Sequence, residues 1–108
     1  MTNGATPKYM IGVAAELLGM HPQTLRMYEQ RGLIAPKRSP KNTRLYSQRD
    51  VERLRRIQQM TAEGLNLAGV ETVLALEAQV QKLRAEVERL RKRIAELEGK
   101  DQQNGEQS

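Results

Sequence analysis

Two short stretches near the start of the chain alternate apolar and polar residues with the period of a helix. In the first, apolar residues share one face until a glycine ends the run: Ile11, Val13, Ala14, Leu17, Leu18 and then Gly19. The second, residues 22–31, begins with Pro22, which suits the first helical position, and His21 lies at the cap before it. Leu25 faces inward and Gly32 ends this helix. Two short helices joined by a tight turn predict a helix-turn-helix, although many helical proteins contain that pattern.

The next segment, residues 33–47, changes to a strand pattern. Pro36 and Pro40 exclude a continuous helix, whereas four residues near its ends favour strands: Leu33, Ile34, Leu45 and Tyr46. The segment therefore predicts a two-stranded hairpin with a polar tip at 39–43. An isolated hairpin is only marginally stable, so this one must pack on the helices. A helix-turn-helix with a basic hairpin attached is a winged helix-turn-helix.

A longer helix follows the hairpin. Ser47 and Asp50 match the capping-box spacing, and an apolar stripe continues as far as Gly64: Val51, Leu54, Ile57 and Met60. Asn66 can cap a further short helix over 67–76. The predicted fold class is therefore mainly α, a winged helix-turn-helix domain of four helices and a small β-hairpin within about 75 residues.

The last third of the chain carries a narrow apolar seam. Its spacing alternates four and three without a break: Leu76, Val80, Leu83, Val87, Leu90, Ile94 and Leu97. This spacing predicts a coiled-coil helix, and the alternative is a single amphipathic helix packed on its own domain. The tail is polar, and we expect it to be disordered. The predicted organisation is a flexible start (1–8), a winged domain (9–75), a dimerisation helix (76–98) and the tail (99–108).

Positive charge is concentrated in the predicted winged domain. The chain has a net charge of +5; residues 20–60 hold ten Lys and Arg against three Asp and Glu, a balance of +7, and the rest has a balance of −2. A positive balance confined to one region suits a surface that faces nucleic-acid phosphates. Charge alone does not exclude the alternative that these basic residues only form a solvent-exposed face of the protein.

The composition excludes several other classes of protein. The chain has no cysteine, which rules out disulfides, thiolate metal sites and thiol redox sensing. No apolar run is long enough to span a membrane and the N-terminus lacks the core of a signal peptide, so we expect a cytoplasmic, nucleoid-associated protein. His21 is the single histidine and has no carboxylates at ligand spacing, so we expect no metal and no cofactor. No acid–base pair, nucleophile motif or phosphate loop supports an enzyme.

Motifs between residue 9 and about residue 75 resemble the DNA-binding domain of MerR-family transcriptional regulators. They are Y-x-I-G at 9–12, T-L-R-x-Y-E-x-x-G-L at 24–33 and R-x-Y at 44–46. The resemblance implies that the second helix enters the major groove of double-stranded DNA and that the hairpin contacts the DNA backbone.

This resemblance, together with position, assigns the expected DNA contacts. Gln23 and Thr24 are expected to face base edges, with His21 at the helix entrance. Backbone contacts are expected from the remaining candidates: Arg26, Tyr28, Lys37, Arg38, Lys41, Arg44 and Tyr46. For Tyr28 and Tyr46 the alternative is a packing role in the core. Lys37, Arg38 and Lys41 are assigned by charge and location only.

Two phrases resemble the heat-shock repressor subgroup (HspR) of this family, VAAELLGMHPQTLR at 13–26 and EGLNLAGV at 63–70. This resemblance implies a repressor that binds an inverted-repeat operator of chaperone genes, with the Hsp70-type chaperone (DnaK) as co-repressor. An activator of another regulon is the alternative within DNA binding. A coiled-coil adaptor or assembly protein is the alternative outside it.

A homodimer is expected because one winged domain reads only one half-site. In the seam, the β-branched residues occupy heptad position a and the leucines occupy position d, a combination that favours a parallel pair of helices. Two ion pairs across a parallel interface, Glu86 with Arg91 and Arg93 with Glu98, favour the same orientation. The MerR resemblance instead implies an antiparallel coiled coil, in which each helix also packs on the partner's DNA-binding domain. Because such packing would bury apolar area, which outweighs exposed ion pairs, we expect the antiparallel homodimer.

Overall fold

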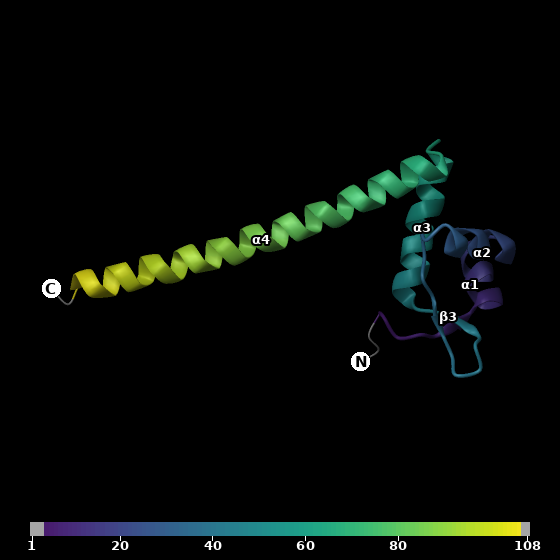
Figure 1. The fold of residues 1–108 in the computed structure, drawn as a ribbon, viewed down its shortest axis with the longest axis horizontal. Helices are drawn as coiled ribbons and strands as arrows, with labels where there is room; N and C mark the ends of the chain where they lie inside the picture. The colour runs from purple at the N-terminus through teal and green to yellow at the C-terminus, as the bar shows by residue number, and fades with distance from the viewer. Residues whose placement is uncertain (1–3, 107–108) are drawn as a thin grey trace. The chain divides into compact units, whose positions relative to one another are not determined.

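The computed structural model describes residues 4–106, with side chains as far as residue 101. The chain divides into two units at the boundary between Val70 and Glu71; we call the first the winged unit and the second the C-terminal unit. The elements, in chain order, are β1 (Tyr9–Met10), α1 (Ile11–Leu18), α2 (Pro22–Gln30), β2 (Lys37–Arg38), β3 (Arg44–Tyr46), α3 (Gln48–Ala62) and α4 (Leu67–Glu106) (Figure 1). The predicted class, a mainly helical winged helix-turn-helix, is confirmed.

The helix-turn-helix consists of α1 and α2, and its turn requires a glycine. Gly19 has a φ of 63°, in the left-handed region where a glycine costs least. The turn lets the Met20 N–H donate to the Ala15 carbonyl at 2.9 Å, which satisfies an end carbonyl of α1. The inward faces are short: Ala14, Ala15 and Leu18 are buried on α1, and Leu25 and the aromatic Tyr28 on α2. The tight turn therefore holds α2 directly against α1.

The wing belongs to a three-stranded antiparallel sheet, whereas the sequence predicted two strands. The order is β1-β3-β2, so β3 is central, and Tyr9 pairs with Tyr46 across it. The hairpin tip forms as predicted, because the Ser39 N–H donates to the Thr43 carbonyl at 2.8 Å. The third strand escaped prediction because two residues are too short to show a strand period. Leu33 and Ile34, expected in a strand, are instead buried in the loop after α2.

The segment before β1 is tied to the winged unit. The Lys8 N–H donates to the Tyr46 carbonyl and the Arg49 N–H donates to the Gly4 carbonyl, both at 3.0 Å. Residues 1–3, the rest of the segment predicted to be flexible, lie outside the described residues.

Helix α3 packs against α1 of the helix-turn-helix and against β3 of the sheet. It begins with the predicted capping box, in which Ser47 Oγ accepts from the Asp50 N–H at 3.1 Å and the Asp50 carboxylate accepts from the Ser47 N–H at 2.9 Å. Its predicted apolar stripe is buried: Val51, Leu54, Ile57 and Met60. The Gln58 amide donates to the Leu18 carbonyl at 2.9 Å, which fastens the end of α1 to α3. Figure 1 shows α1 and α2 on one side of α3, with the hairpin extending from the same unit.

Helix α4 is longer than predicted. Asn66 caps it as expected, with its side-chain oxygen accepting from the Gly69 N–H at 2.8 Å. The expected short helix over 67–76 and the dimerisation helix over 76–98 are one continuous helix, because no Gly or Pro interrupts residues 70–98. The helix also continues to Glu106, into the tail for which disorder was predicted. Gly99 and Gly105 cost about 1 kcal/mol each in a helix, whereas Lys100, Gln102, Gln103 and Glu106 are good helix formers. Residues 107–108 lie outside the described range.

Candidate nucleic-acid interface

The first turn of α2 is fixed by the cap that the sequence predicted. His21 Nδ1 accepts from the Gln23 N–H at 3.2 Å, which requires that nitrogen to be unprotonated. The Thr24 N–H donates to the His21 carbonyl at 2.9 Å. His21 and Gln23 are exposed and Thr24 is half-buried. The three residues expected at the DNA bases therefore lie together at the start of one helix.

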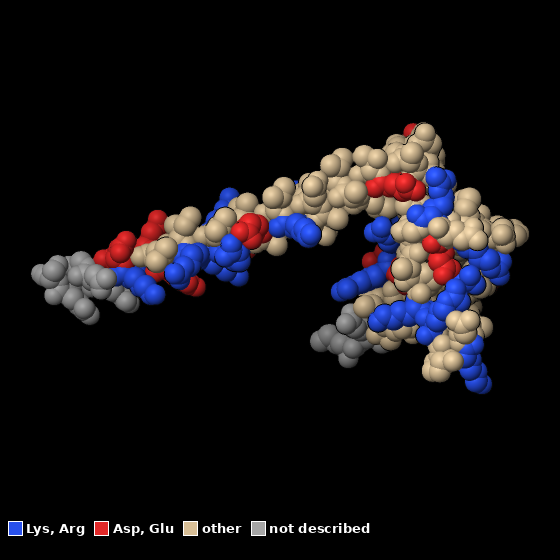
Figure 2. Space-filling model, viewed as in Figure 1, with Lys and Arg blue, Asp and Glu red and all other residues tan. Residues whose placement is uncertain are grey.

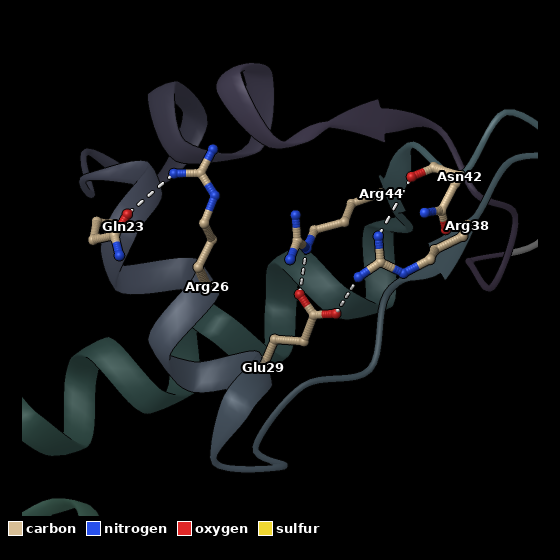
Figure 3. Close-up of polar contacts among 6 residues, drawn as sticks. All are labelled: Gln23, Arg26, Glu29, Arg38, Asn42 and Arg44. Atoms are coloured by element: carbon tan, nitrogen blue, oxygen red, sulfur yellow. Dashed lines mark hydrogen bonds and ion pairs between the residues drawn. The ribbon is translucent and has the colours of Figure 1, made fainter.

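Arg26 contacts Gln23 one turn earlier on the same helix. Its Nη1 donates to Gln23 Oε1 at 3.2 Å (Figure 3). The bond occupies one lone pair of the amide oxygen and leaves the amide NH₂ of Gln23 with two donors. Arg26 thus links two successive turns of α2 through Gln23, a contact that the sequence did not predict.

Glu29, in the last turn of α2, joins this helix to both strands of the wing. Its Oε1 accepts from Arg38 Nη2 at 3.2 Å, and its Oε2 accepts from Arg44 Nε (Figure 3). The Glu29 side chain is 21% exposed, and those of Arg38 and Arg44 are 39% and 29% exposed. Glu29 is not among the residues that the sequence predicts for the site, although it is the only acidic residue between Glu16 and Asp50.

The wing tip presents the other predicted cations. Lys37 and Lys41 are exposed, as is Arg38. Arg38 also reaches the tip, where its Nη1 donates to the Asn42 carbonyl at 3.4 Å. Asn42 has a φ of 64°, and asparagine tolerates that left-handed conformation better than most residues. Basic side chains from β2, β3 and the tip therefore lie on the same hairpin.

The two tyrosines among the predicted site residues lie in the core. Tyr28 is 5% exposed and Tyr46 is 0% exposed. Burial raises the pKa of both phenols above their ordinary value of 10.0; the charges of Glu29 and Asp50 raise that of Tyr46 further, and Arg44 and Arg26 oppose them. Among the described residues, the Tyr46 hydroxyl has no hydrogen-bond partner. The burial favours the packing role for both residues, and DNA contact by either stays a prediction.

Two arginines of α3 bind backbone carbonyls of neighbouring segments. Arg53 Nε donates to the Leu33 carbonyl at 2.7 Å, and Arg55 Nη2 donates to the Leu17 carbonyl at 3.4 Å. These two of the four arginines of α3 thus hold the ends of neighbouring segments. Figure 2 shows Lys and Arg gathered over the winged unit, whereas Lys or Arg and Asp or Glu alternate along α4. The local charge of +7 therefore includes arginines that also bind the protein's own backbone.

The predicted dimerisation residues form an exposed apolar row on α4. Exposure ranges from 43% at Val80 to 64% at Leu83 across the whole set: Leu76, Val80, Leu83, Val87, Leu90, Ile94 and Leu97. Seven large apolar side chains exposed at coiled-coil spacing are typical of a helix that pairs with another chain. Beside the row, Glu86 accepts from Arg89 Nε at 3.1 Å, and Arg93 lies 3.5 Å from Glu96. The Arg89 hydrogen bond lowers the pKa of Glu86.

The described part of the chain has neither a cluster of metal-binding side chains nor a membrane-spanning helix. No group of three His, Cys, Asp or Glu side chains there is placed to hold a metal ion. Across residues 4–106, no helix is both long and apolar enough to cross a membrane.

Comparison with known proteins supplies a family for this arrangement. Residues 9–77 match the profile of the MerR HTH family regulatory proteins. Over 81 residues the chain is 52% identical to a Streptomyces coelicolor protein that carries the name heat shock protein HspR, covering 74% of this chain and 54% of that protein. The chain spans about half the length of the first curated relatives that it matches.

Solved structures give the same fold. The N-terminal part of MtaN, the multidrug transporter activator of Bacillus subtilis, has a TM-score of 0.60 and 28% identity, covering 84% of this chain and 95% of that one. HiNmlR, a MerR family regulator that lacks the sensor domain and was solved bound to promoter DNA, has a TM-score of 0.57 and 24% identity, covering 83% of this chain and 75% of that one. The second likeness concerns the fold alone.

Proposed function

Because the chain belongs to the MerR family of helix-turn-helix regulatory proteins, we propose that it is a transcriptional repressor that binds double-stranded DNA sequence-specifically. The observation that carries the proposal is the joint presentation of two elements. Helix α2 exposes Gln23 at its fixed first turn, and a basic wing is bonded to the last turn of the same helix. A base-reading helix next to a phosphate-binding hairpin is the arrangement that DNA recognition requires.

Each element has its own part in the proposed complex. Helix α2 enters the major groove, where Gln23 and Thr24 contact base edges. Arg26 and the wing contact phosphates through Lys37, Arg38, Lys41 and Arg44. Phosphate contacts fix the register of the protein on the duplex, and base contacts give the sequence preference.

The DNA-binding form in this proposal is a homodimer. One winged unit reads a half-site, and a second copy is needed to span an inverted repeat. The exposed row on α4 supplies the dimer contact. The antiparallel arrangement of the two helices is part of the proposal.

The proposed targets are chaperone operons. The identity of 52% to a protein named for heat shock supports this choice, and an Hsp70-type chaperone (DnaK) is the proposed co-repressor. The similarity to MtaN, which is named as a transporter activator, supports activation as the second candidate. The position of the operator relative to the promoter decides between the two.

DNA binding is tested by titrating the protein into two labelled duplexes at several salt concentrations. The first is selected for tight binding from a random pool, and the second is an unselected duplex of the same length. We expect the selected duplex to bind at least about a thousandfold more tightly. We expect both affinities to fall steeply with salt, since counterions are released from the phosphates. Equal affinity for both duplexes would contradict the proposal that the protein binds DNA sequence-specifically.

A matched pair of lysine variants locates the interface. Lys41→Ala removes one cation of the wing tip, so it should lower the salt slope by about one. Lys100→Ala removes the same charge from α4 and should leave the slope unchanged. The same change of salt slope in both variants would mean that DNA binding depends only on the net charge of the protein and not on the position of the lysine.

The regulated genes are tested by deleting the gene for this protein. Chaperone transcripts should then rise at the normal growth temperature and fall again when the gene is restored. Flat chaperone transcripts together with a changed unrelated regulon would refute the heat-shock assignment but leave DNA binding intact.

A further inference from the structure

Glu29 binds two arginines that face each other across the wing. Arg38 of β2 and Arg44 of β3 are directly opposed in the antiparallel register. Like charges in that position repel each other and destabilise a strand pair. The Glu29 carboxylate offsets this repulsion, because each of its oxygens accepts from one of the two guanidiniums (Figure 3).

The surroundings strengthen this three-residue cluster. The Glu29 side chain is only 21% exposed, so water screens the pairs less than it screens pairs on an open surface. One carboxylate that holds two cations is also a small network, which orders side chains more effectively than an isolated pair. The cluster can therefore hold the wing in one position relative to α2.

The contacts continue from the cluster to the wing tip. Arg38 donates from Nη2 to Glu29 and from Nη1 to the carbonyl of Asn42, which turns the hairpin with its positive φ. Glu29 lies eight residues after His21 on the helix that is proposed to read bases. A single side chain thus links the base-reading helix to both strands and, through Arg38, to the tip.

We infer that Glu29 is a positioning residue that sets the wing in register with α2 and so determines sequence discrimination more than overall affinity. The inference rests on the proposed function, DNA binding by α2 and the wing. Wing and helix can each contact DNA without the link. Only when the two are held in register do phosphate contacts by the wing fix α2 over its base pairs.

The arginines need not leave Glu29 in order to contact DNA. An arginine has five N–H donors, and the contact with Glu29 uses only Nε of Arg44. Its remaining donors can bind a phosphate while the carboxylate holds the side chain. The competing mechanism is an exchange, in which both arginines abandon Glu29 for phosphates and Glu29 only weakens binding.

Three variants separate these mechanisms on the same two duplexes, the one selected by the wild-type protein and the unselected one. Glu29→Gln removes the charge and one acceptor. Glu29→Asp keeps the charge but shortens the side chain by one methylene. Glu52→Gln removes an exposed carboxylate of α3 and serves as the charge-matched control. The readout is the ratio of the two dissociation constants, together with amide exchange at Ser39, Asn42 and Thr43 of the wing tip.

We expect Glu29→Gln to reduce the affinity ratio by roughly tenfold and Glu29→Asp by several-fold, with Glu52→Gln within about twofold of the wild type. Amide exchange at the tip should quicken in both Glu29 variants. The inference is overturned if Glu29→Gln tightens binding to both duplexes alike while Glu29→Asp matches the wild type, since Glu29 would then act by charge alone. Should Glu29→Gln fail to fold, Glu29→Asp decides. If the wild-type protein binds both duplexes equally well, the proposed function itself is contradicted, and so is the inference that rests on it.

Discussion

Tyr46 is a polar side chain enclosed in an aliphatic core. Its ring is fully buried at the centre of the sheet, next to the charged cluster of the wing. A buried hydroxyl that loses its hydrogen bonds to water on folding and gains none in return destabilises the fold. Among the described residues the Tyr46 hydroxyl has no partner, so the ring contributes packing whereas the oxygen atom does not help stability.

Replacing Tyr46 with phenylalanine should therefore be neutral or stabilising. We expect Tyr46→Phe to raise the free energy of unfolding by up to about 1 kcal/mol at neutral pH, measured by urea titration. Tyr9→Phe is the matched control, because the Tyr9 hydroxyl donates to Gln48 at 3.2 Å and its loss should cost up to about 1 kcal/mol. If Tyr46→Phe costs more than Tyr9→Phe, the buried hydroxyl has a partner after all.

The same substitution should change the response to alkaline pH. The folded-state pKa of Tyr46 lies above its ordinary value of 10.0, so the unfolded chain loses the phenolic proton first. The corresponding stability is present below pH 10.0 and is lost as the pH rises through the folded-state pKa. The alkaline loss of unfolding free energy should be smaller in Tyr46→Phe than in the wild type.

At the scale of elements, features governed by neighbouring residues could be predicted from the sequence. The His21 cap, the Ser47 capping box and the apolar stripe of α3 depend on residues within a few positions of each other. Strand β1 and the role of Glu29 could not be predicted in this way. Tyr9 pairs with Tyr46, and Glu29 binds Arg44, only after the chain has folded. The apolar seam that begins at Leu76 predicts a separate helix, whereas residues 67–106 form one helix.

Substitutions at two positions of α2 should affect DNA binding differently, because one residue is proposed to contact bases and the other a phosphate. Gln23→Ala should cost about 1–3 kcal/mol on the selected duplex and little on the unselected one. Arg26→Ala should weaken binding to both and lower the salt slope by about one, and Arg26→Lys should keep that slope. Because Arg26 donates to Gln23, Arg26→Ala should also reduce some of the sequence preference. An unchanged slope with the preference lost would make Arg26 a support for Gln23 only.

At the scale of the whole molecule, the proposed DNA contacts and the proposed dimer contacts lie in different units. The net positive charge lies on the winged unit, because the Lys and Arg of α4 are interspersed with Asp and Glu (Figure 2). The exposed apolar row lies on α4. The charge pairs that favour a parallel dimer require Glu86 and Arg93 to reach a partner chain. Both already have partners on their own helix, since Glu86 pairs with Arg89 and Arg93 with Glu96. An exposed pair across a parallel interface would have to replace an equally exposed pair within the helix, so its net contribution is close to zero.

The orientation of the dimer can therefore be tested through the seam itself. The chain has no cysteine, so introduced cysteines report on one contact each. In an antiparallel pair whose helices cross at Ala85, Val80 of one copy faces Leu90 of the other, whereas in a parallel pair each faces its own counterpart. We expect mixed Val80→Cys and Leu90→Cys proteins to form a disulfide-linked dimer on mild oxidation and neither protein alone to do so. Linkage of each variant to itself, with none between the two, would establish the parallel dimer, because two sulfurs can bond only when their Cα atoms lie within about 7 Å.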